Sequence, residues 1–268
     1  MTPAAPADRP ALLPRALLAL AVATLMLLVV GPLLRLLLEA SPASLGAALA
    51  DAEVRGAIGL TVLTASAATL LGVLLGVPVA WLLARRPFPG RTLVEGVLQL
   101  PVVVPHPVGG IALLLFFSRG SALGGALAQA GLEVVSHVPG IVVAMLFVSV
   151  PLVISGAREA FRGVDPRLER VARTLGDSGW DAVRRVTLPL AGRGILAAAL
   201  LAWARAVSEF GSIVILTYHP KVAPVLIFDR FTAYGLEAAV PAAVLLLLVA
   251  LGVFALVRLV ERREAARA

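Results

Sequence analysis

Residues 168–179 read LERVARTLGDSG, a polar stretch with apolar runs on both sides. The whole chain is 60% hydrophobic and only 15% charged, and its mean hydropathy of +0.98 is higher than that of ordinary globular domains. This composition predicts a membrane protein. The polar stretch is then predicted to be a loop outside the bilayer, because lipid offers no partner for unpaired polar groups.

Six apolar runs are long enough to cross a bilayer as helices, which takes about 20 mostly apolar residues. They cover residues 16–34, 60–83, 94–117, 141–157, 195–216 and 238–260. We therefore predict an all-α polytopic membrane protein with six transmembrane helices. Pro101, Pro105 and Pro107 lie inside the third run and predict a break in its helix.

The first run has some features of a secretory signal, because Arg9 and Arg15 precede its hydrophobic core. That core, of about 19 residues, is longer than a signal needs. Arg35 follows it, where a signal would have a cleavage site with small residues. We expect an uncleaved membrane helix.

Basic residues are distributed unevenly between alternate loops. Of the 23 lysines and arginines, 17 lie on the side of the N-terminal tail and five on the opposite side. Because basic residues accumulate in cytoplasmic loops, this bias predicts that both termini are cytoplasmic. The net charge of +7 is explained by membrane orientation, so we expect no nucleic-acid partner.

We divide the chain into three parts. Residues 1–55 are expected to form a cytoplasmic tail, the first transmembrane helix and an outer loop. Residues 56–260 are expected to form the core, with a cytoplasmic loop over residues 158–193, and residues 261–268 a cytoplasmic tail.

Residue types that are missing exclude several chemistries. The chain has no cysteine, so disulfides, thiolate nucleophiles and cysteine-ligated metals are excluded. Its only lysine is Lys221, in HPKVAP, so a G-x-x-x-x-G-K-[ST] loop for ATP is absent. His137 and His219 fall in separate outer loops without metal-ligand spacing. We expect neither a metal nor a cofactor.

The polar stretch carries its own helix signals. Asp165 is a suitable cap for a helix that begins at Pro166, where a missing N–H costs nothing. Apolar residues then recur at i, i+3, i+4 and i+7 and form one stripe: Leu168, Val171, Ala172 and Leu175. Gly176 is suited to a left-handed turn that ends this helix.

A second helix is expected directly afterwards. Ser178 and Asp181 have the spacing of a capping box, and Pro189 is expected to close the helix. The amphipathic helix of residues 166–175 either lies in the lipid headgroups or docks on a partner protein. Its narrow apolar stripe and the bend at Gly176 favour docking.

The run ERVARTLGDSGWDAVRRVTLP, residues 169–189, resembles the cytoplasmic signature loop of binding-protein-dependent ABC importer permeases. That signature has Glu-Ala-Ala, three residues, Gly, and a hydrophobic residue with Leu-Pro about ten residues later. The matching residues are Glu169, Ala172, Arg173, Leu175, Gly176, Leu188 and Pro189, whereas Arg170 and Val171 depart from the commonest form. The resemblance implies that this helix is the coupling helix, which sits in a cleft of a separate ATP-binding subunit. The residues implied in this contact are Leu168, Glu169, Ala172, Arg173, Leu175, Gly176 and Asp177.

The resemblance covers residues 56–259. LPVVVPHPVGGIALLLFF (100–117) and AVSEFGSIVIL (206–216) look like the branch that imports molybdate, tungstate and sulfate. PHPVGG and residues 218–239 are most similar to the tungstate/molybdate members, with a sulfate or thiosulfate permease as the alternative. The resemblance implies a type I ABC importer permease (MetI-like) fold in the inner membrane. It also implies a homodimer, two ATP-binding subunits, an extracytoplasmic binding protein and no enzymatic activity in this chain.

Small residues recur every four positions in the second run, at Thr64, Ala68, Gly72, Gly76 and Ala80. A stripe of this kind lets a second helix approach closely. We expect a tight helix pair along this face.

Arg205 and Glu209 lie in an apolar run, where charged residues seldom face lipid. At i and i+4 they either neutralise each other or line a water-filled path. His106, between two prolines, is either a pathway residue or a packed histidine. In the resembled family the gating region maps near residues 208–211. The pathway candidates are therefore His106, Arg205, Ser208, Glu209, Phe210 and Gly211.

Two other classes of protein were weighed. Gly176, Asp177, Ser178 and Gly179 spell G-x-S-G, which also occurs in intramembrane serine proteases. Such a serine needs a histidine base at membrane depth, whereas Ser178 lies in a highly charged loop. A membrane scaffold without a transport role would explain neither the prolines nor the intramembrane charges.

Overall fold

The computed structural model describes the backbone of residues 12–265 and the side chains of residues 17–255. This part of the chain is helical and contains no strand. Its elements are α1 (Leu12–Glu39), α2 (Pro42–Ala50), α3 (Ala52–Arg85), α4 (Arg91–Val103), α5 (His106–Phe117), α6 (Ala122–Gln129), α7 (Val138–Arg162), α8 (Pro166–Thr174), α9 (Gly179–Ala182), η1 (Val183–Thr187), α10 (Leu188–Val207), α11 (Ile213–Leu216), α12 (Ala223–Tyr234) and α13 (Leu236–Ala265).

Five of the described helices are long and apolar enough to cross a membrane. They are α1, α3, α7, α13 and the continuous helix Gly179–Val207, which joins α9, η1 and α10. The helices α4 and α5 form a sixth span if they are taken together, but they meet at an angle of 112°. The prediction of an all-α membrane protein is confirmed, and so is the predicted break among the prolines.

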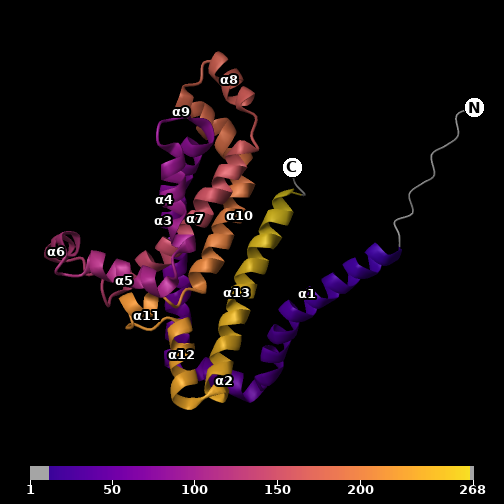
Figure 1. Cartoon of the computed structure of the whole chain (residues 1–268), viewed down its shortest axis with the longest axis vertical. Coiled ribbons are helices and arrows are strands. Elements are labelled where there is room, and N and C mark those ends of the chain that lie inside the picture. Colours follow the sequence, from indigo (N-terminus) through magenta and orange to yellow (C-terminus); the bar gives the residue numbers. More distant parts are fainter. Residues whose placement is uncertain (1–11, 266–268) are drawn as a thin grey trace, which may run out of the picture.

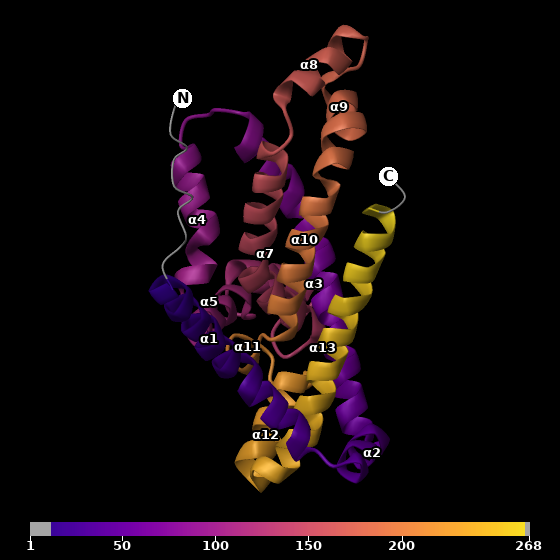
Figure 2. The ribbon, with the colours of Figure 1, turned by 90° about the vertical axis from the view of Figure 1, so that its right-hand side faces the viewer.

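The spans α3, α7, α10 and α13 run side by side along the long axis (Figures 1 and 2). One end of the molecule carries α8 and α9, and the other end carries α2 and α12 (Figure 1). The helix α1 leans away from the bundle (Figure 1). Its apolar residues in the described span Leu17–Glu39 are largely exposed, although α1 contacts α13. An exposed apolar span of this kind is covered by lipid or by another subunit.

The predicted small-residue stripe is buried between α3 and α7. A Cβ atom added to Gly76 would lie 3.1 Å from Ile154 Cγ1, and one added to Gly72 would lie 3.5 Å from Val153 Cγ2. The two backbones are therefore as close as small residues allow, which confirms the expected tight helix pair.

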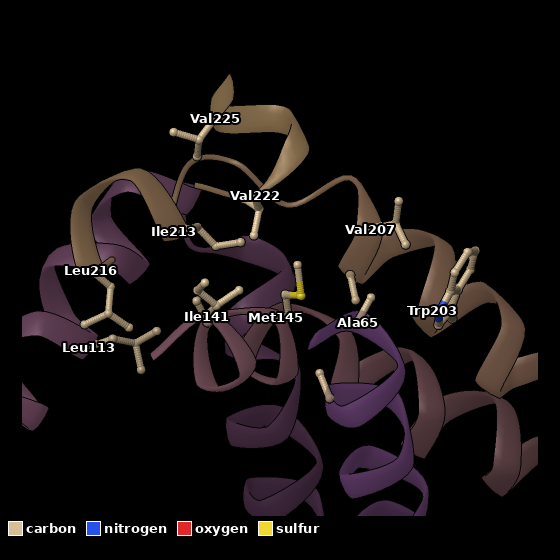
Figure 3. Close-up of a cluster of buried hydrophobic side chains, with 13 residues drawn as sticks. Ala65, Leu113, Ile141, Met145, Trp203, Val207, Ile213, Leu216, Val222 and Val225 are labelled. Atoms are coloured by element: carbon tan, nitrogen blue, oxygen red, sulfur yellow. The ribbon is translucent and has the colours of Figure 1, made fainter. Parts of the chain in front are cut away.

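The largest core cluster lies where α3, α5, α7, α10, α11 and α12 meet. Figure 3 shows Ile141 and Met145 of α7 beside Ile213 of α11 and Ala65 of α3. Trp203 of α10 closes the cluster, and its indole N–H donates to Ser66 Oγ at 3.1 Å. This packing fixes the end of α10 and the short helix α11 next to the start of α5.

Two helix boundaries differ from the prediction. Pro189 does not close a helix, because η1 is a π-helical turn that carries the chain from α9 into α10. A π turn changes the hydrogen-bond pattern locally, and Pro189, which has no N–H to donate, follows this turn within the continuous helix. The fifth run was predicted as one helix over 195–216, but α10 ends at Val207 and α11 begins at Ile213.

The helix α12 was not predicted and occupies what was expected to be an outer loop. Its first N–H, from Ala223, donates to Thr61 Oγ1 of α3 at 2.8 Å. Arg230 also contacts Asp51 Oδ2 at 2.5 Å, at the start of α3. The hydrogen bond from the Arg230 guanidinium lowers the pKa of Asp51 below its ordinary value. The end of the molecule that carries α2 and α12 is thus held to α3 by contacts between residues that are distant in sequence.

Candidate functional site

The predicted site residues lie in two separate places. The pathway candidates gather where α5 begins and α10 ends, and the coupling candidates lie on α8 and the turn that follows it. In Figures 1 and 2 the first place is roughly level with the middle of α13, and the second is at the end of the molecule.

Two broken helices meet at the first place. The chain bends between α4 and α5 at His106, and α10 stops two residues before Glu209. Non-helical backbone at membrane depth is tolerated only where it is buried in protein or lines a water-filled cavity. The break after Val207, which was not predicted, therefore marks backbone that is buried or lines a cavity, as the predicted break at the prolines does.

His106, Arg205 and Glu209 form one charge cluster at these breaks. The Arg205 guanidinium donates to Glu209 Oε2 at 2.7 Å and to His106 Nε2 at 2.5 Å. Because arginine is always a donor, the His106 ring accepts in this contact. Nδ1 of His106 is 3.8 Å from Glu209 Oε2. The sequence predicted these residues singly, and the fold brings all three together.

Ser212 joins the two helix breaks, at His106 and after Val207, by hydrogen bonds. Its N–H donates to Glu209 Oε1 at 2.7 Å, and its hydroxyl donates to the His106 carbonyl at 2.9 Å. Gly211 permits this approach, since an added Cβ would lie 2.8 Å from His106 Cβ. Sequence reasoning missed Ser212, although its position directly after SEFG was a signal.

The remaining pathway candidates differ in their roles. Ser208 caps the end of α10, where its hydroxyl donates to the Arg205 carbonyl at 3.0 Å. Phe210 packs against Phe228 of α12, with ring centroids 5.0 Å apart, and belongs to the margin of the core. Phe210 therefore stabilises the break rather than joining the charge cluster.

The charge cluster is open on one side. Glu209 is fully buried, whereas 23% of the Arg205 side chain and 46% of the His106 side chain are exposed. The ion pair expected as one interpretation is formed, but it leaves part of the guanidinium accessible. A partly exposed arginine at membrane depth faces water or another protein surface rather than lipid.

At the second place the predicted helix forms with the predicted signals. α8 begins at Pro166, and Asp165 Oδ1 accepts a hydrogen bond from the Arg167 N–H at 2.8 Å. Gly176 has a φ of +106°, in the region that favours glycine. The capping and the turn are therefore confirmed in detail.

The apolar stripe of α8 is divided between two directions. Ala172 is buried against the rest of the chain, whereas Leu168, Val171 and Leu175 are 44%, 55% and 83% exposed. The helix α8 lies at one end of the molecule (Figure 1). Three large exposed apolar side chains on and directly after this helix form a docking surface or a headgroup contact.

Glu169 points toward its own chain. Its Oε1 accepts from Arg85 Nε at 3.0 Å and from Thr187 Oγ1 at 2.6 Å. The guanidinium of Arg85 also donates to the Val164 carbonyl at 2.8 Å. Glu169 thus joins α8 to the end of α3 and to η1. Arg85 and Thr187 were not predicted, because both lie far from α8 in sequence.

The turn after α8 has polar contacts of its own. Asp177 Oδ1 accepts from Arg185 Nη1 at 3.0 Å, and Arg173 is exposed. Ser178 Oγ accepts from the Asp181 N–H at 3.1 Å and donates to Asp181 Oδ2 at 2.5 Å. Ser178 is therefore a helix cap, which is the role predicted from its spacing.

The chain matches one protein family over most of its length. Residues 72–265 match the model of the family described as binding-protein-dependent transport system inner membrane component. The chain is 44% identical to the molybdate/tungstate transport system permease protein WtpB of Thermococcus kodakarensis over 216 residues, which are 80% of this chain and 82% of that protein. It is 33% identical to the sulfate transport system permease protein CysW of Synechocystis, over 81% of this chain and 80% of that one.

Solved structures show a similar fold. A chain of a bacterial ABC transporter that imports the acidic polysaccharide alginate aligns with a TM-score of 0.75 at 17% identity, over 94% of this chain and 95% of that one. The same transporter is also solved in complex with its periplasmic protein bound to an alginate pentasaccharide, and aligns with the same TM-score. The fold predicted from the sequence, that of ABC importer permeases, is confirmed. None of these proteins supports the serine-protease interpretation.

Proposed function

Because the chain belongs to the family of binding-protein-dependent transport system inner membrane components, we propose that it is the permease subunit of an ATP-driven importer for a tetrahedral oxyanion. Molybdate or tungstate is the expected cargo. The observation that carries this proposal is the 44% identity, over 80% of the chain, to a molybdate/tungstate permease. Sulfate is the alternative, supported by 33% identity to a sulfate permease.

The charge cluster provides the chemistry that such a cargo needs. A tetrahedral dianion meets a large electrostatic barrier at membrane depth, and a partly open guanidinium lowers it. The buried carboxylate of Glu209 offsets this attraction, so that the anion passes without binding too tightly. His106 and Arg205 therefore belong to the pathway, and Glu209 and Ser212 hold them in place.

A second copy of the chain supplies the other half of the pathway. The open side of the charge cluster faces water or another protein surface, and the exposed span α1 faces lipid or another subunit, so a second copy of the chain is a suitable neighbour for both. A homodimer places two such open sides against each other around one path. The isolated chain is then half of a transport unit.

The exposed residues Leu168, Val171 and Leu175 dock on a separate ATP-binding subunit. Two such subunits hydrolyse ATP, and this chain is not itself an enzyme. Arg85 and Thr187 hold α8 through Glu169, so movement of the docked subunit reaches α3 and η1 directly. An external binding protein delivers the anion, and both termini lie in the cytoplasm of the cell that carries this inner-membrane protein.

Reconstitution tests the proposal. The chain is placed in vesicles together with a candidate ATP-binding subunit and a candidate binding protein from the same organism, and uptake of molybdate, tungstate and sulfate is measured with ATP on the cytoplasmic side. We expect uptake of molybdate or tungstate that needs both ATP and the binding protein. Uptake of sulfate alone would support the alternative. A binding protein that takes a sugar or an amino acid and none of these anions would refute the oxyanion assignment.

A further inference from the structure

A pocket lies behind α8, between this helix and the cytoplasmic-side end of α3. Its volume is about 600 Å³. Four arginines and two tryptophans line it: Arg85, Arg86, Arg170, Arg173, Trp81 and Trp180. We call it the arginine pocket. It is separate from the charge cluster and from the exposed apolar residues of α8, although two of its lining residues, Glu169 and Arg173, are also among the predicted coupling residues.

The arginine pocket and the docking surface lie on opposite faces of α8. At about 100° per residue, the directions of Arg170 and Arg173 differ by about 160° from the mean direction of Leu168, Val171 and Leu175. A partner on the apolar face therefore leaves the basic face free. The pocket stays between α8 and its own bundle.

The pocket has an excess of unpaired positive charge. Arg85 is neutralised by Glu169 at 3.0 Å. The side chains of Arg86, Arg170 and Arg173 make no hydrogen bond or salt bridge with any residue whose side chain the structure describes. Three free guanidinium groups that face one cavity attract an anion, because their mutual repulsion is relieved when one binds.

We propose that the arginine pocket binds a phosphate-type tetrahedral oxyanion. The planar fork of arginine matches two oxygens of such a group. Arg86 lies at the end of α3, and Arg170 and Arg173 lie on α8, so one bound anion bridges the two elements. The bridge would hold α8 against the membrane domain, in the same direction as the contact between Arg85 and Glu169.

Two kinds of molecule carry an anionic group that these arginines can bind. One is the headgroup of an anionic phospholipid in the adjacent leaflet, since Trp81 and Trp180 are the aromatic residues favoured at headgroup level. The other is a free anion such as phosphate or the transported oxyanion. Both are bound by the same arginines, and an experiment separates them.

Tryptophan fluorescence is the signal by which binding at the arginine pocket is measured. Of the three in the chain, Trp81 and Trp180 line the pocket and Trp203 is buried in the core. The full chain in phosphatidylcholine nanodiscs is titrated with short-chain phosphatidylglycerol, short-chain phosphatidylcholine, inorganic phosphate and tungstate, and tryptophan fluorescence is recorded. No ATP, ATP-binding subunit or transport is involved, so the result is independent of the proposed function.

We expect one anionic probe to change the fluorescence and phosphatidylcholine to change nothing. A response to phosphatidylglycerol alone assigns the site to lipid, and a response to phosphate or tungstate assigns it to the free anion. The variant Arg86→Gln with Arg170→Gln should bind at least about tenfold more weakly, because it loses two charge-assisted contacts. The matched control, Arg167→Gln with Arg184→Gln, removes equal charge outside the pocket and should bind as the wild type does.

Three results would overturn the site. They are no response to any anionic probe, equal binding by the pocket variant and the wild type, and equal weakening in the control. Circular dichroism and size-exclusion chromatography show whether the double variant folds. If it does not, Arg86→Gln alone, which leaves α8 unchanged, gives the same test.

Discussion

The two candidate places differ in how the sequence builds them. α8 and its turn depend on residues within about a dozen positions of each other, from the cap at Asp165 to the bend at Gly176. The charge cluster depends on residues that are 99 positions apart, because Arg205 bonds His106. The helix α8 and its turn form from neighbouring residues and are exposed. The charge cluster forms only when the bundle is assembled.

This difference predicts different failures after mutation. A change in the charge cluster should damage the folded bundle, since three elements share the same few hydrogen bonds. A change in the turn after α8 should leave the bundle intact and disturb only what docks there. Variants of the two places can therefore test whether they are as independent as the structure indicates.

The largest effect is expected from Glu209→Leu. The substitution removes both acceptors of a fully buried carboxylate, so the Arg205 guanidinium and the Ser212 N–H lose their partners. Breaking such a pair costs about 3 kcal/mol, and the partial exposure of Arg205 keeps the loss at this lower end. Thermal unfolding in detergent should show a clear decrease in melting temperature, and uptake should be lost.

The double variant Arg205→Leu with Glu209→Leu separates structure from transport. If the two residues only neutralise each other, replacing both recovers most of the stability lost in Glu209→Leu, short of the unpaired Ser212 N–H, and uptake recovers with it. If Arg205 lines the pathway, the double variant assembles normally but imports poorly. Melting temperature and vesicle uptake are measured on the same preparation. Full transport with full stability would contradict the pathway assignment.

A smaller effect on stability, with a large one on coupling, is expected from Gly176→Val. Open space surrounds Gly176, so the cost comes from its φ of +106° and not from a clash. A β-branched residue there costs about 1–3 kcal/mol of local strain and turns the docking surface. We expect transport to fall at least about tenfold, with ATPase stimulation lost and the melting temperature lowered by only about 2–4 °C for each kcal/mol of strain.

Gly192→Val is the matched control for that variant. Gly192 lies in α10 with open space and without a left-handed backbone, so valine should be tolerated. Normal coupling in the Gly176 variant would contradict the assignment of α8. Loss of coupling in both variants would show that the effect is not specific to the turn.

The same difference explains which features could be predicted from the sequence. Caps, the glycine turn and the small-residue stripe act over one or two helical turns, so their spacing was sufficient. The break after Val207 was missed because apolar residues resume at Ile213–Leu216 and the intervening residues 208–212 were read as part of the same span, whereas the contacts of Glu209 and Ser212 hold a non-helical backbone there. Arg85 was missed for a related reason, since its partner Glu169 is 84 positions away. Pro189 was misplaced because a π turn cannot be recognised from residue spacing.

The smallest effect is expected from Ser178→Ala, and it tests the local character of the α8 region. The substitution removes the cap of α9, where Oγ accepts from the Asp181 N–H, at a cost of about 1 kcal/mol. Uptake should remain near the wild-type level. Complete loss of uptake in a folded Ser178→Ala protein would contradict this small, local role and would place the cap of α9 among the features that coupling needs.

The pH dependence of the same variant gives a finer measure. The Ser178 hydroxyl lowers the pKa of Asp181 below its ordinary value of 3.8. A carboxyl group with a lowered folded-state pKa stabilises the fold above pH about 4, and this contribution is lost as the pH falls through the lowered pKa. Melting temperatures of wild type and Ser178→Ala should therefore differ most at neutral pH, and the difference should shrink to the part due to the backbone cap as the pH falls through the lowered pKa, because the protonated carboxyl no longer gains from the hydroxyl. A constant difference across this range would mean that the cap acts only through the backbone N–H, and that the hydroxyl–carboxylate contact adds nothing to the stability of this turn.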